Sequence, residues 1–317
     1  MGNRLKEALT QLQSQVAKVL IGKDQVVELL SIALISQGHV LLEDVPGTGK
    51  TMLAKVLAKS INGQFSRVQL TPDVLPSDIT GIQIYNPKDQ TFEIKPGPVM
   101  TNILLTDEIN RATPRTQASL LEVMEERQVT IEGETLKIEG PFIVVATQNP
   151  IEQQGTFPLP EAQMDRFLMQ IQMGYPTLEE ERRVMRLYRE DEPIEQLQAI
   201  FELADIQKWQ QEVRKVTLSE EVETYLLNIV QGTRQHNYIE SGVSPRGTLA
   251  FMKAAQARAF LHDRSFVTPD DLKILAPSIL AHRLVLSMEG EMRSSKRDLI
   301  YDVLRQVEVP VEEGARE

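Results

Sequence analysis

The chain has 317 residues, of which 41% are hydrophobic and 25% charged, and this composition excludes disorder over most of its length. Its 34 basic and 45 acidic residues give a formal net charge of −11, which argues against a surface that binds nucleic-acid backbones nonspecifically. The absence of cysteine excludes disulfides, thiolate metal sites and cysteine nucleophiles.

Two helices are expected before the first strand. Apolar residues at helical spacing predict one between Met1 and Leu20, and the second extends from Val26 to Ile35 and ends near Gly38. The first segment carries charges among its apolar residues, unlike a signal peptide, and no apolar run approaches the roughly 20 residues of a membrane-spanning helix. We therefore expect a cytoplasmic protein with no membrane insertion.

Five apolar, strand-like runs then alternate with helical patterns, which predicts a parallel five-stranded sheet in an α/β domain. These runs cover residues 39–43, 65–70, 103–106, 142–147 and 168–173. Two pairs of shorter alternating segments predict β-hairpins inserted beside the sheet. The first hairpin joins residues 82–85 to 91–94, and the second joins 128–132 to 135–139 through a turn at Gly133-Glu134.

The chain beyond Pro176 has no strand patterns. Helical periodicity resumes at residues 222–230, 248–261 and 269–280. Residues 179–195 are dense in charge and predict a solvent-facing helix. We therefore expect an α/β domain over residues 1–176 and an all-helical domain over residues 177–317.

A strand, a glycine turn and a helix follow one another between His39 and Ser60, which is the context of a phosphate-binding P-loop. The turn glycines let backbone N–H groups wrap the phosphates, while Lys50 reaches the β and γ phosphates and Thr51 offers a hydroxyl to Mg²⁺. The common pattern has glycine where this chain has Asp44, a residue that tolerates left-handed backbone. The residues predicted to hold the nucleotide here are Pro46, Gly47, Thr48, Gly49, Lys50, Thr51 and Met52.

Asp107 and Glu108 follow a buried apolar strand, at the end where the ligands of doubly wound sheets gather. Alone, such a pair is more often a solvated turn. Downstream of a P-loop, we expect Asp107 to hold the Mg²⁺ shell and Glu108 to activate water. The chain has no Asn-Lys-x-Asp element for reading guanine, so the sequence favours ATP over GTP.

Four segments together resemble the MoxR-type AAA+ ATPases, and the similarity extends over nearly the whole chain. They are residues 41–51, 105–112, 146–150 and 159–167. The resemblance implies a P-loop AAA+ αβα core followed by a helical lid. It also implies ATP and Mg²⁺ as cofactors and hydrolysis of ATP to ADP and phosphate as the activity.

The resemblance assigns roles to residues around the nucleotide. Asn149 corresponds to sensor 1, which helps to position the attacking water, and an Asx turn before the following proline is a compatible alternative. Ile21 and Gly22 match the segment that lies against the adenine in related proteins. Their alternative is a plain turn between two helices.

Two arginines complete the expected site. Arg166 matches the arginine finger that acts on the neighbouring subunit's γ-phosphate, and its alternative is an ion pair with Asp165 or Glu161. Arg111 and Arg115 are secondary candidates for this role.

Arg246 corresponds to sensor 2, donated by the lid. It lies in the first turn of a predicted helix, where a cation needs a compensating anion, and ATP between the α/β domain and the lid is expected to be that anion. The alternative is a capping arginine or one at the edge of the core.

The resemblance implies a ring, a hexamer in this family, that works as a chaperone-like remodeller. Its expected partners are a client protein complex, matured or activated by steps such as metal or cofactor insertion, and a von Willebrand factor A domain protein. We expect the two hairpins to face the ring pore or a partner. The alternatives are a nucleic-acid motor, disfavoured because the hairpins and their flanks offer only Lys88, Lys95, Arg127 and Lys137, and a small-molecule P-loop kinase.

Overall fold

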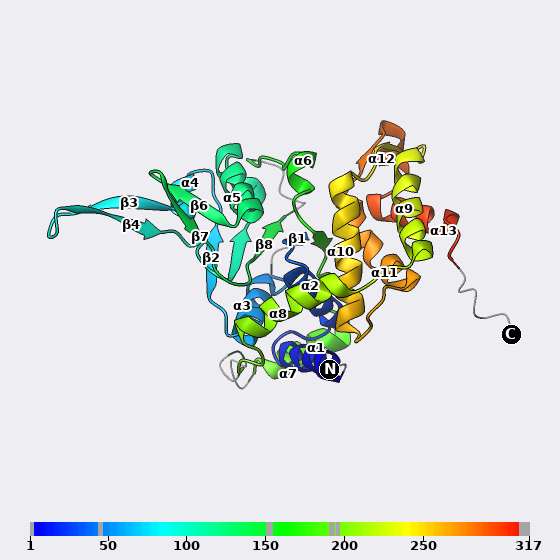
Figure 1. Ribbon diagram of the computed structural model, residues 1–317, viewed down its shortest axis with the longest axis horizontal. Coiled ribbons are helices and arrows are strands. Elements are labelled where there is room, and N and C mark those ends of the chain that lie inside the picture. The colour runs from blue at the N-terminus through cyan, green and yellow to red at the C-terminus, as the bar shows by residue number, and fades with distance from the viewer. Residues whose placement is uncertain (1–2, 44–46, 150–154, 190–193, 195–196, 311–317) are drawn as a thin grey trace.

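The computed structural model describes residues 3–43, 47–149, 155–189, 194 and 197–310. These residues form a central sheet flanked by helices, with a second group of helices beside it (Figure 1). Asp44 and Pro46, two residues of the expected P-loop, lie outside the described ranges.

The central sheet has five parallel strands, as predicted. In spatial order they are β2 (Phe65–Gln69), β5 (Ile103–Asp107), β8 (Ile143–Gln148), β1 (Val40–Glu43) and β9 (Met169–Ile171). Because all four pairings are parallel, every strand begins at one edge of the sheet, the N-terminal edge, and ends at the other, the C-terminal edge. At about 3.3 Å per residue, the length of β5 separates the two edges by roughly 13 Å.

Alternate strand residues face two separate hydrophobic cores, because successive side chains point to opposite faces of a sheet. Leu42 and Leu105 belong to one core, while Leu41 and Leu104 belong to the other. The first core is shared with α1 (Asn3–Ala17), α2 (Asp24–Ile35), α3 (Lys50–Ser60) and α8 (Leu203–Glu212), and the second with α5 (Pro114–Glu126). The predicted αβα layering is therefore confirmed.

Both predicted hairpins are present. The first consists of β3 (Gly81–Asn86) and β4 (Thr91–Pro96), follows α4 (Pro76–Thr80), and extends away from the body of the molecule (Figure 1). The second consists of β6 (Gln128–Ile131) and β7 (Glu134–Lys137).

The turn of the second hairpin lies one residue earlier than predicted. Ile131 pairs with Glu134, so the two turn residues are Glu132 and Gly133 rather than Gly133 and Glu134. Their φ angles are 47° and 87°, as a two-residue turn with both central residues left-handed requires. The correction follows from backbone geometry, because both turn positions need a positive φ.

The second group of helices, called the lid below, is helical as predicted except for one short two-stranded ladder. Its helices are α9 (Glu220–Gln235), α10 (Pro245–Leu261), α11 (Pro269–Leu280), α12 (Met288–Arg293) and α13 (Lys296–Gln306). The ladder pairs β10 (Ile239–Ser241) with β11 (Val285–Leu286) in antiparallel fashion. Shorter elements are α6 (Glu161–Met164), α7 (Leu178–Leu187) and the 3₁₀ turns η1 (Ile109–Arg111), η3 (Val213–Lys215) and η4 (Ala281–Arg283).

The segment between sheet and lid packs on the sheet domain. Helix α7 has no buried residue, which agrees with the expected solvent-facing helix. Helix α8 rests against α2, where Gln210 Nε2 donates a hydrogen bond to the Leu34 carbonyl (2.8 Å). The domain boundary near Pro176 stays a prediction, because α8 lies beyond it in sequence and on the sheet domain in space.

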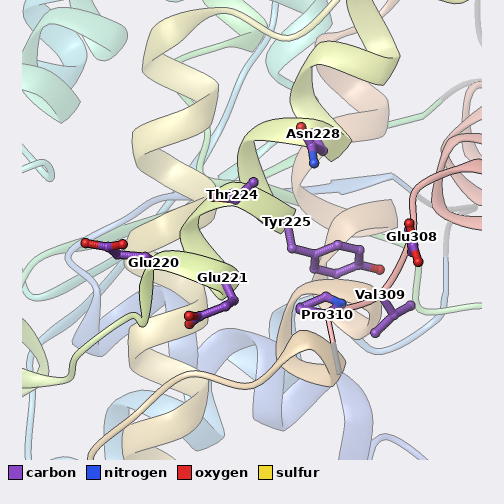
Figure 2. A pocket seen from close by; sticks show the side chains of 8 residues that line it. All are labelled: Glu220, Glu221, Thr224, Tyr225, Asn228, Glu308, Val309 and Pro310. Atoms are coloured by element: carbon purple, nitrogen blue, oxygen red, sulfur yellow. The ribbon is translucent and has the colours of Figure 1, made fainter. Parts of the chain in front are cut away.

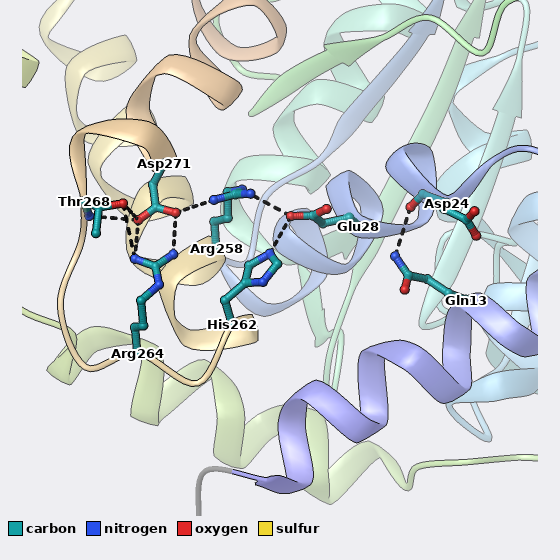
Figure 3. A network of polar contacts seen from close by, with 8 residues as sticks. All are labelled: Gln13, Asp24, Glu28, Arg258, His262, Arg264, Thr268 and Asp271. Carbon is teal, nitrogen blue, oxygen red and sulfur yellow. Dashed lines mark hydrogen bonds and ion pairs between the residues drawn. The ribbon is translucent and has the colours of Figure 1, made fainter.

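A chain of ion pairs fastens the lid to α2 (Figure 3). Arg258 of α10 pairs with Glu28 of α2 (3.2 Å) and with Asp271 of α11 (2.5 Å), and Arg264 also pairs with Asp271 (2.6 Å). Burial opposes the charged form of Asp271, but hydrogen bonds from Arg264, Thr268 and Arg258 lower its pKa overall. The buried carboxylate is thus compensated, and α10 has a fixed position relative to α2.

Candidate active site

In the described part of the expected P-loop, two glycines have left-handed backbone. Gly47 and Gly49 have φ angles of 87° and 91°, which other residues rarely adopt, and α3 begins at Lys50. A Cβ added at Gly49 would lie 2.6 Å from the Leu20 Cδ2 atom, whereas one at Gly47 would meet nothing within 4 Å. The N-terminus of α3 therefore faces an open turn at the C-terminal edge, a setting that fits a triphosphate.

Asp107 ends β5 at the same edge and is bound by side chains from both neighbouring strands. Arg67 of β2 donates from Nε to Asp107 Oδ2 (2.7 Å), and Thr147 of β8 donates from Oγ1 to Asp107 Oδ1 (3.3 Å). Asp107 is 7% exposed. Sequence reasoning missed Arg67 and Thr147. Arg67 is paired with Leu105, two residues before Asp107, and Thr147 follows Ala146, the partner of Thr106.

Glu108 is held in one orientation at the next position. Its φ is 59°, its backbone N–H donates to Thr147 Oγ1 (2.9 Å), and its Oε2 accepts hydrogen bonds from Gln69 Nε2 (2.9 Å) and Arg111 Nη1 (3.2 Å). Gln69 was not identified from the sequence. Arg111 faces Glu108 of its own chain, and this position does not favour a role on a neighbouring subunit.

Three further predicted residues lie at the C-terminal edge. Asn149 directly follows β8 and is 8% exposed. Gly22 has a φ of 73°, and the next residue, Lys23, donates from Nζ to the Met173 carbonyl (2.7 Å) just after β9. This bond fastens the loop with Ile21 and Gly22 to the end of the sheet. An added Cβ at Gly22 would lie 1.9 Å from Glu180 Oε1, so the loop is closely covered.

The two expected γ-phosphate arginines lie elsewhere. Arg166 follows α6, Arg246 lies in the first turn of α10, and both contact Glu125 in the last turn of α5. That turn of α5 is at the N-terminal edge, because the Met124 carbonyl bonds His39 Nε2 (2.9 Å) just before β1.

The position expected for Arg246 is therefore corrected. Its compensating anion is Glu125, and it lies at the opposite edge of the sheet from Lys50 rather than beside the same chain's P-loop. The physical reason is the docking of α10. The helix is fastened to α2 near its C-terminal end by Arg258, which leaves its N-terminal end at the start of the strands.

A buried ion pair joins the two arginine-bearing segments. Asp165 Oδ1 accepts from Arg283 Nε (2.7 Å), and Asp165 Oδ2 accepts from Ser244 Oγ (2.8 Å). Ser244 is the N-cap of α10 and also accepts from the Gly247 N–H (3.0 Å). Burial lowers the pKa of Arg283, while its charge interaction and hydrogen bond with Asp165 raise it. The predicted alternative partner of Arg166, Asp165, is thus engaged with Arg283 instead.

Comparisons with known proteins agree with this architecture. The model of the ATPase family associated with various cellular activities matches residues 39–169, and the AAA lid domain matches residues 231–303. Chaperone MoxR1 of Mycobacterium tuberculosis is 40% identical over 306 residues, which cover 93% of this chain and 81% of that protein.

The chain belongs to the MoxR family of AAA+ ATPases.

Other members and a solved structure extend over nearly the same length. Protein MoxR of Methylorubrum extorquens is 30% identical to this MoxR-family chain over 331 residues, covering 96% of each. An uncharacterized protein of Bacillus subtilis, YeaC, is 49% identical over 301 residues, covering 95% of this chain and 94% of that one. The crystal structure of a candidate ATPase from Cytophaga hutchinsonii superimposes with a TM-score of 0.90 at 40% identity, covering 97% of this chain and 96% of that one.

Other parts of the described chain offer little for catalysis. No group of three or more His, Asp or Glu in the described ranges is arranged to hold a metal ion. A pocket of about 610 Å³ between α9 and residues 308–310 is lined by none of the predicted site residues (Figure 2). Of the helices that the structure describes, none combines the length and the apolar character needed to span a bilayer.

Proposed function

We propose that this MoxR-family ATPase binds ATP with Mg²⁺ at the C-terminal edge of the sheet and hydrolyses it to ADP and phosphate. The observation that carries the proposal is the convergence of the glycine turn, the start of α3 and the Asp107-Glu108 pair at that edge. Lys50 and Thr51 would bind the phosphates and Mg²⁺, and the metal ion would neutralise developing charge on the phosphates.

Glu108 is the proposed general base. Its carboxylate lies at the end of a buried strand, partly exposed and oriented by Gln69 and Arg111. Asn149 follows the adjacent strand β8, within the same edge, and would orient the attacking water. Ile21 and Gly22 would contact the adenine from the α1–α2 loop.

We further propose that Arg166 and Arg246 complete the site of a neighbouring subunit. They lie across the sheet from their own P-loop, and they lie together at one exposed place on the surface. A contact between the N-terminal edge of one subunit and the C-terminal edge of the next is head-to-tail, and such contacts form a ring when the rotation between successive subunits closes. The family suggests a hexamer in the cytoplasm.

The work of this ring is the remodelling of a partner protein, in keeping with the chaperone name of the M. tuberculosis relative. The exposed side chains of the β3–β4 hairpin favour a protein as the partner. Tyr85 and Phe92 pack together near its tip (5.3 Å between ring centroids) yet are 53% and 68% exposed. Exposed apolar surface of this kind marks interaction sites. The partner would be a client protein complex, on which the ring would act together with a von Willebrand factor A domain protein. This remodelling would include metal or cofactor insertion.

The experiment for the proposed activity measures phosphate release and native mass together. The wild type should hydrolyse ATP with Mg²⁺ and form a ring, whereas Glu108→Gln should form the ring with ATP bound and release almost no phosphate. Normal turnover by Glu108→Gln would contradict the proposed base. Strong stimulation of the wild type by DNA at physiological salt would instead favour the nucleic-acid motor.

The experiment for the hairpins separates output from hydrolysis. Replacing Glu132-Gly133, with Ile131 and Leu136, by a short Gly-Ser turn should keep ATP affinity and turnover within severalfold, because all four residues belong to the separate β6–β7 hairpin and none is a proposed nucleotide ligand. Partner-stimulated activity should be lost. Full client activation by this variant would refute the output role.

A further inference from the structure

Arg166 and Arg246 share one carboxylate. Glu125 Oε2 lies 3.5 Å from Arg166 Nε, and Glu125 Oε1 accepts a hydrogen bond from Arg246 Nη2. One arginine belongs to the sheet domain and the other to the lid. A single acidic side chain therefore holds two cations from two parts of the chain.

This shared contact is weak enough to exchange. The side chains of Arg166, Arg246 and Glu125 are 32%, 44% and 40% exposed, so solvent screens both ion pairs. A terminal phosphate carries more charge than a carboxylate and accepts several hydrogen bonds from guanidinium groups. A phosphate within reach would therefore displace Glu125 from both arginines.

The backbones that carry the two arginines are held much more firmly. Asp165 precedes Arg166 and bonds both the buried Arg283 and Ser244, the N-cap of the helix that carries Arg246. Arg283 also donates from Nη2 to the Phe167 carbonyl (2.6 Å). Exchange therefore needs only rotation of the two long side chains and no movement of the lid.

The surroundings of Glu125 do not suit a phosphate. A hollow of about 360 Å³ beside it is lined by three carboxylates, those of Glu122, Glu125 and Glu126, together with Arg166. A phosphate placed there would be repelled by these like charges. Arg166 must therefore turn out of the hollow, and Arg246 away from Glu125, to meet an anion from outside.

We propose that Glu125 is a latch that holds Arg166 and Arg246 against the free subunit and releases them to the nucleotide of an adjoining subunit. This inference rests on the proposed action of both arginines on a neighbour. The latch keeps the guanidinium groups paired, and so competes with assembly, until an ATP-loaded neighbour supplies a stronger anion. Glu125 is then a positioning residue that sets the subunit concentration at which the ring becomes active.

The test is specific ATPase activity as a function of subunit concentration at saturating ATP. Glu125→Gln removes the competing charge with little change in shape, so the concentration for half-maximal activity should fall about three- to tenfold. Activity at high concentration should stay within twofold, and the KM for ATP there should not change. Glu125→Asp, which keeps the charge, should stay close to the wild type.

Glu122→Gln is the matched control, because it removes the same charge from the same hollow one helical turn earlier. Its half-maximal concentration should equal that of the wild type. An unchanged or higher value for Glu125→Gln would overturn the latch, and so would lower activity at every concentration, which indicates a structural role. The proposed function fails separately if wild-type activity does not depend on concentration or if Arg166→Ala keeps full activity.

Discussion

The two edges of the central sheet differ in how their chemistry is assembled. At the C-terminal edge, short sequence motifs directly follow β1, β5 and β8, and neighbouring strands orient their side chains, as Arg67 and Thr147 orient Asp107. At the N-terminal edge, two arginines far apart in sequence meet at Glu125 only because the lid docks beside α6. One edge has the groups proposed to bind and cleave a nucleotide, and the other has the two arginines proposed to meet a neighbour's γ-phosphate.

This difference underlies the proposal that a single subunit is an incomplete enzyme. The edges are roughly 13 Å apart across β5, so the arginines and the P-loop of one chain face different surroundings.

Loss of Arg166 at the N-terminal edge should lower turnover strongly without removing the P-loop. Arg166→Ala should lower turnover by about 10³-fold or more, because an arginine finger neutralises charge that develops on the phosphates. Phosphate release by assembled rings measures this. Arg305→Ala, which removes an exposed arginine of α13 that pairs only with Asp302 among the ion pairs described, is the control and should retain turnover.

Mixing tests whether the two edges belong to different subunits. Arg166→Ala and Glu108→Gln subunits, each inactive alone, should regain some turnover when mixed, because some interfaces then pair two intact edges. Flat activity at every mixing ratio, with mixed rings verified by mass, would show that Arg166 acts within its own chain.

At the C-terminal edge, two substitutions should separate binding from chemistry. Glu108→Gln should lower turnover by about 10²-fold or more while ATP still binds, because only the general base is lost. Lys50→Ala should abolish ATP binding, since it removes the cation that opposes the β and γ phosphates. Nucleotide titration beside phosphate release distinguishes them, and normal affinity in Lys50→Ala would refute the P-loop assignment.

Breaking the Asp165–Arg283 ion pair, which supports the N-terminal edge, should lower the free energy of unfolding. Asp165→Asn leaves Arg283, whose side chain is 2% exposed, without its counter-charge, so the free energy of unfolding should fall by about 3 kcal/mol. Urea unfolding measures this. Asp270→Asn, which breaks an exposed pair with Lys273, is the control and should leave the unfolding midpoint unchanged. Equal unfolding midpoints for Asp165→Asn and Asp270→Asn would mean that the buried Asp165–Arg283 pair contributes little to stability.

Acid should weaken the N-terminal edge through His39. Burial lowers its pKa to about 4, and neutral His39 accepts from the Val144 N–H at Nδ1 and donates to the Met124 carbonyl. The unfolded chain binds a proton between pH 6.5 and 4 that the folded chain does not, so stability falls as pH falls through this window. At pH 5 the contribution of His39 should be about 2 kcal/mol lower than at pH 7.

Urea unfolding of the wild type and His39→Gln at pH 7 and pH 5 tests this. The variant lacks the titrating ring, so its loss of stability between the two pH values should be about 2 kcal/mol smaller. His282 is also buried, with a pKa lowered by burial, and should add to the acid sensitivity of both proteins equally. Identical pH dependence of the two proteins would contradict the buried neutral state of His39.

The sequence by itself determined the parallel sheet, the hairpins and the groups at the C-terminal edge. Apolar runs mark buried strands, and a parallel sheet brings all strand ends to one edge, so motifs that directly follow strands must gather there. Lys50, Asp107, Glu108 and Asn149 could be placed from local spacing alone, while their chemical roles stay predictions. The predicted turn of the β6–β7 hairpin was misplaced by one residue, because the position of the turn depends on φ angles that the residue types only partly restrict.

Only the tertiary structure decided the position of Arg246 and the partners of the acidic residues. Arg246 was expected beside the same chain's ATP because a helix N-terminus with a cation calls for an anion, and a sequence cannot say which anion lies there. The docking of α10 through Arg258 and Ser244 supplies Glu125 instead. The Ser244–Asp165 contact joins residues 79 positions apart and the Arg246–Glu125 contact residues 121 positions apart. Both depend on the packing of whole helices, which local patterns do not record.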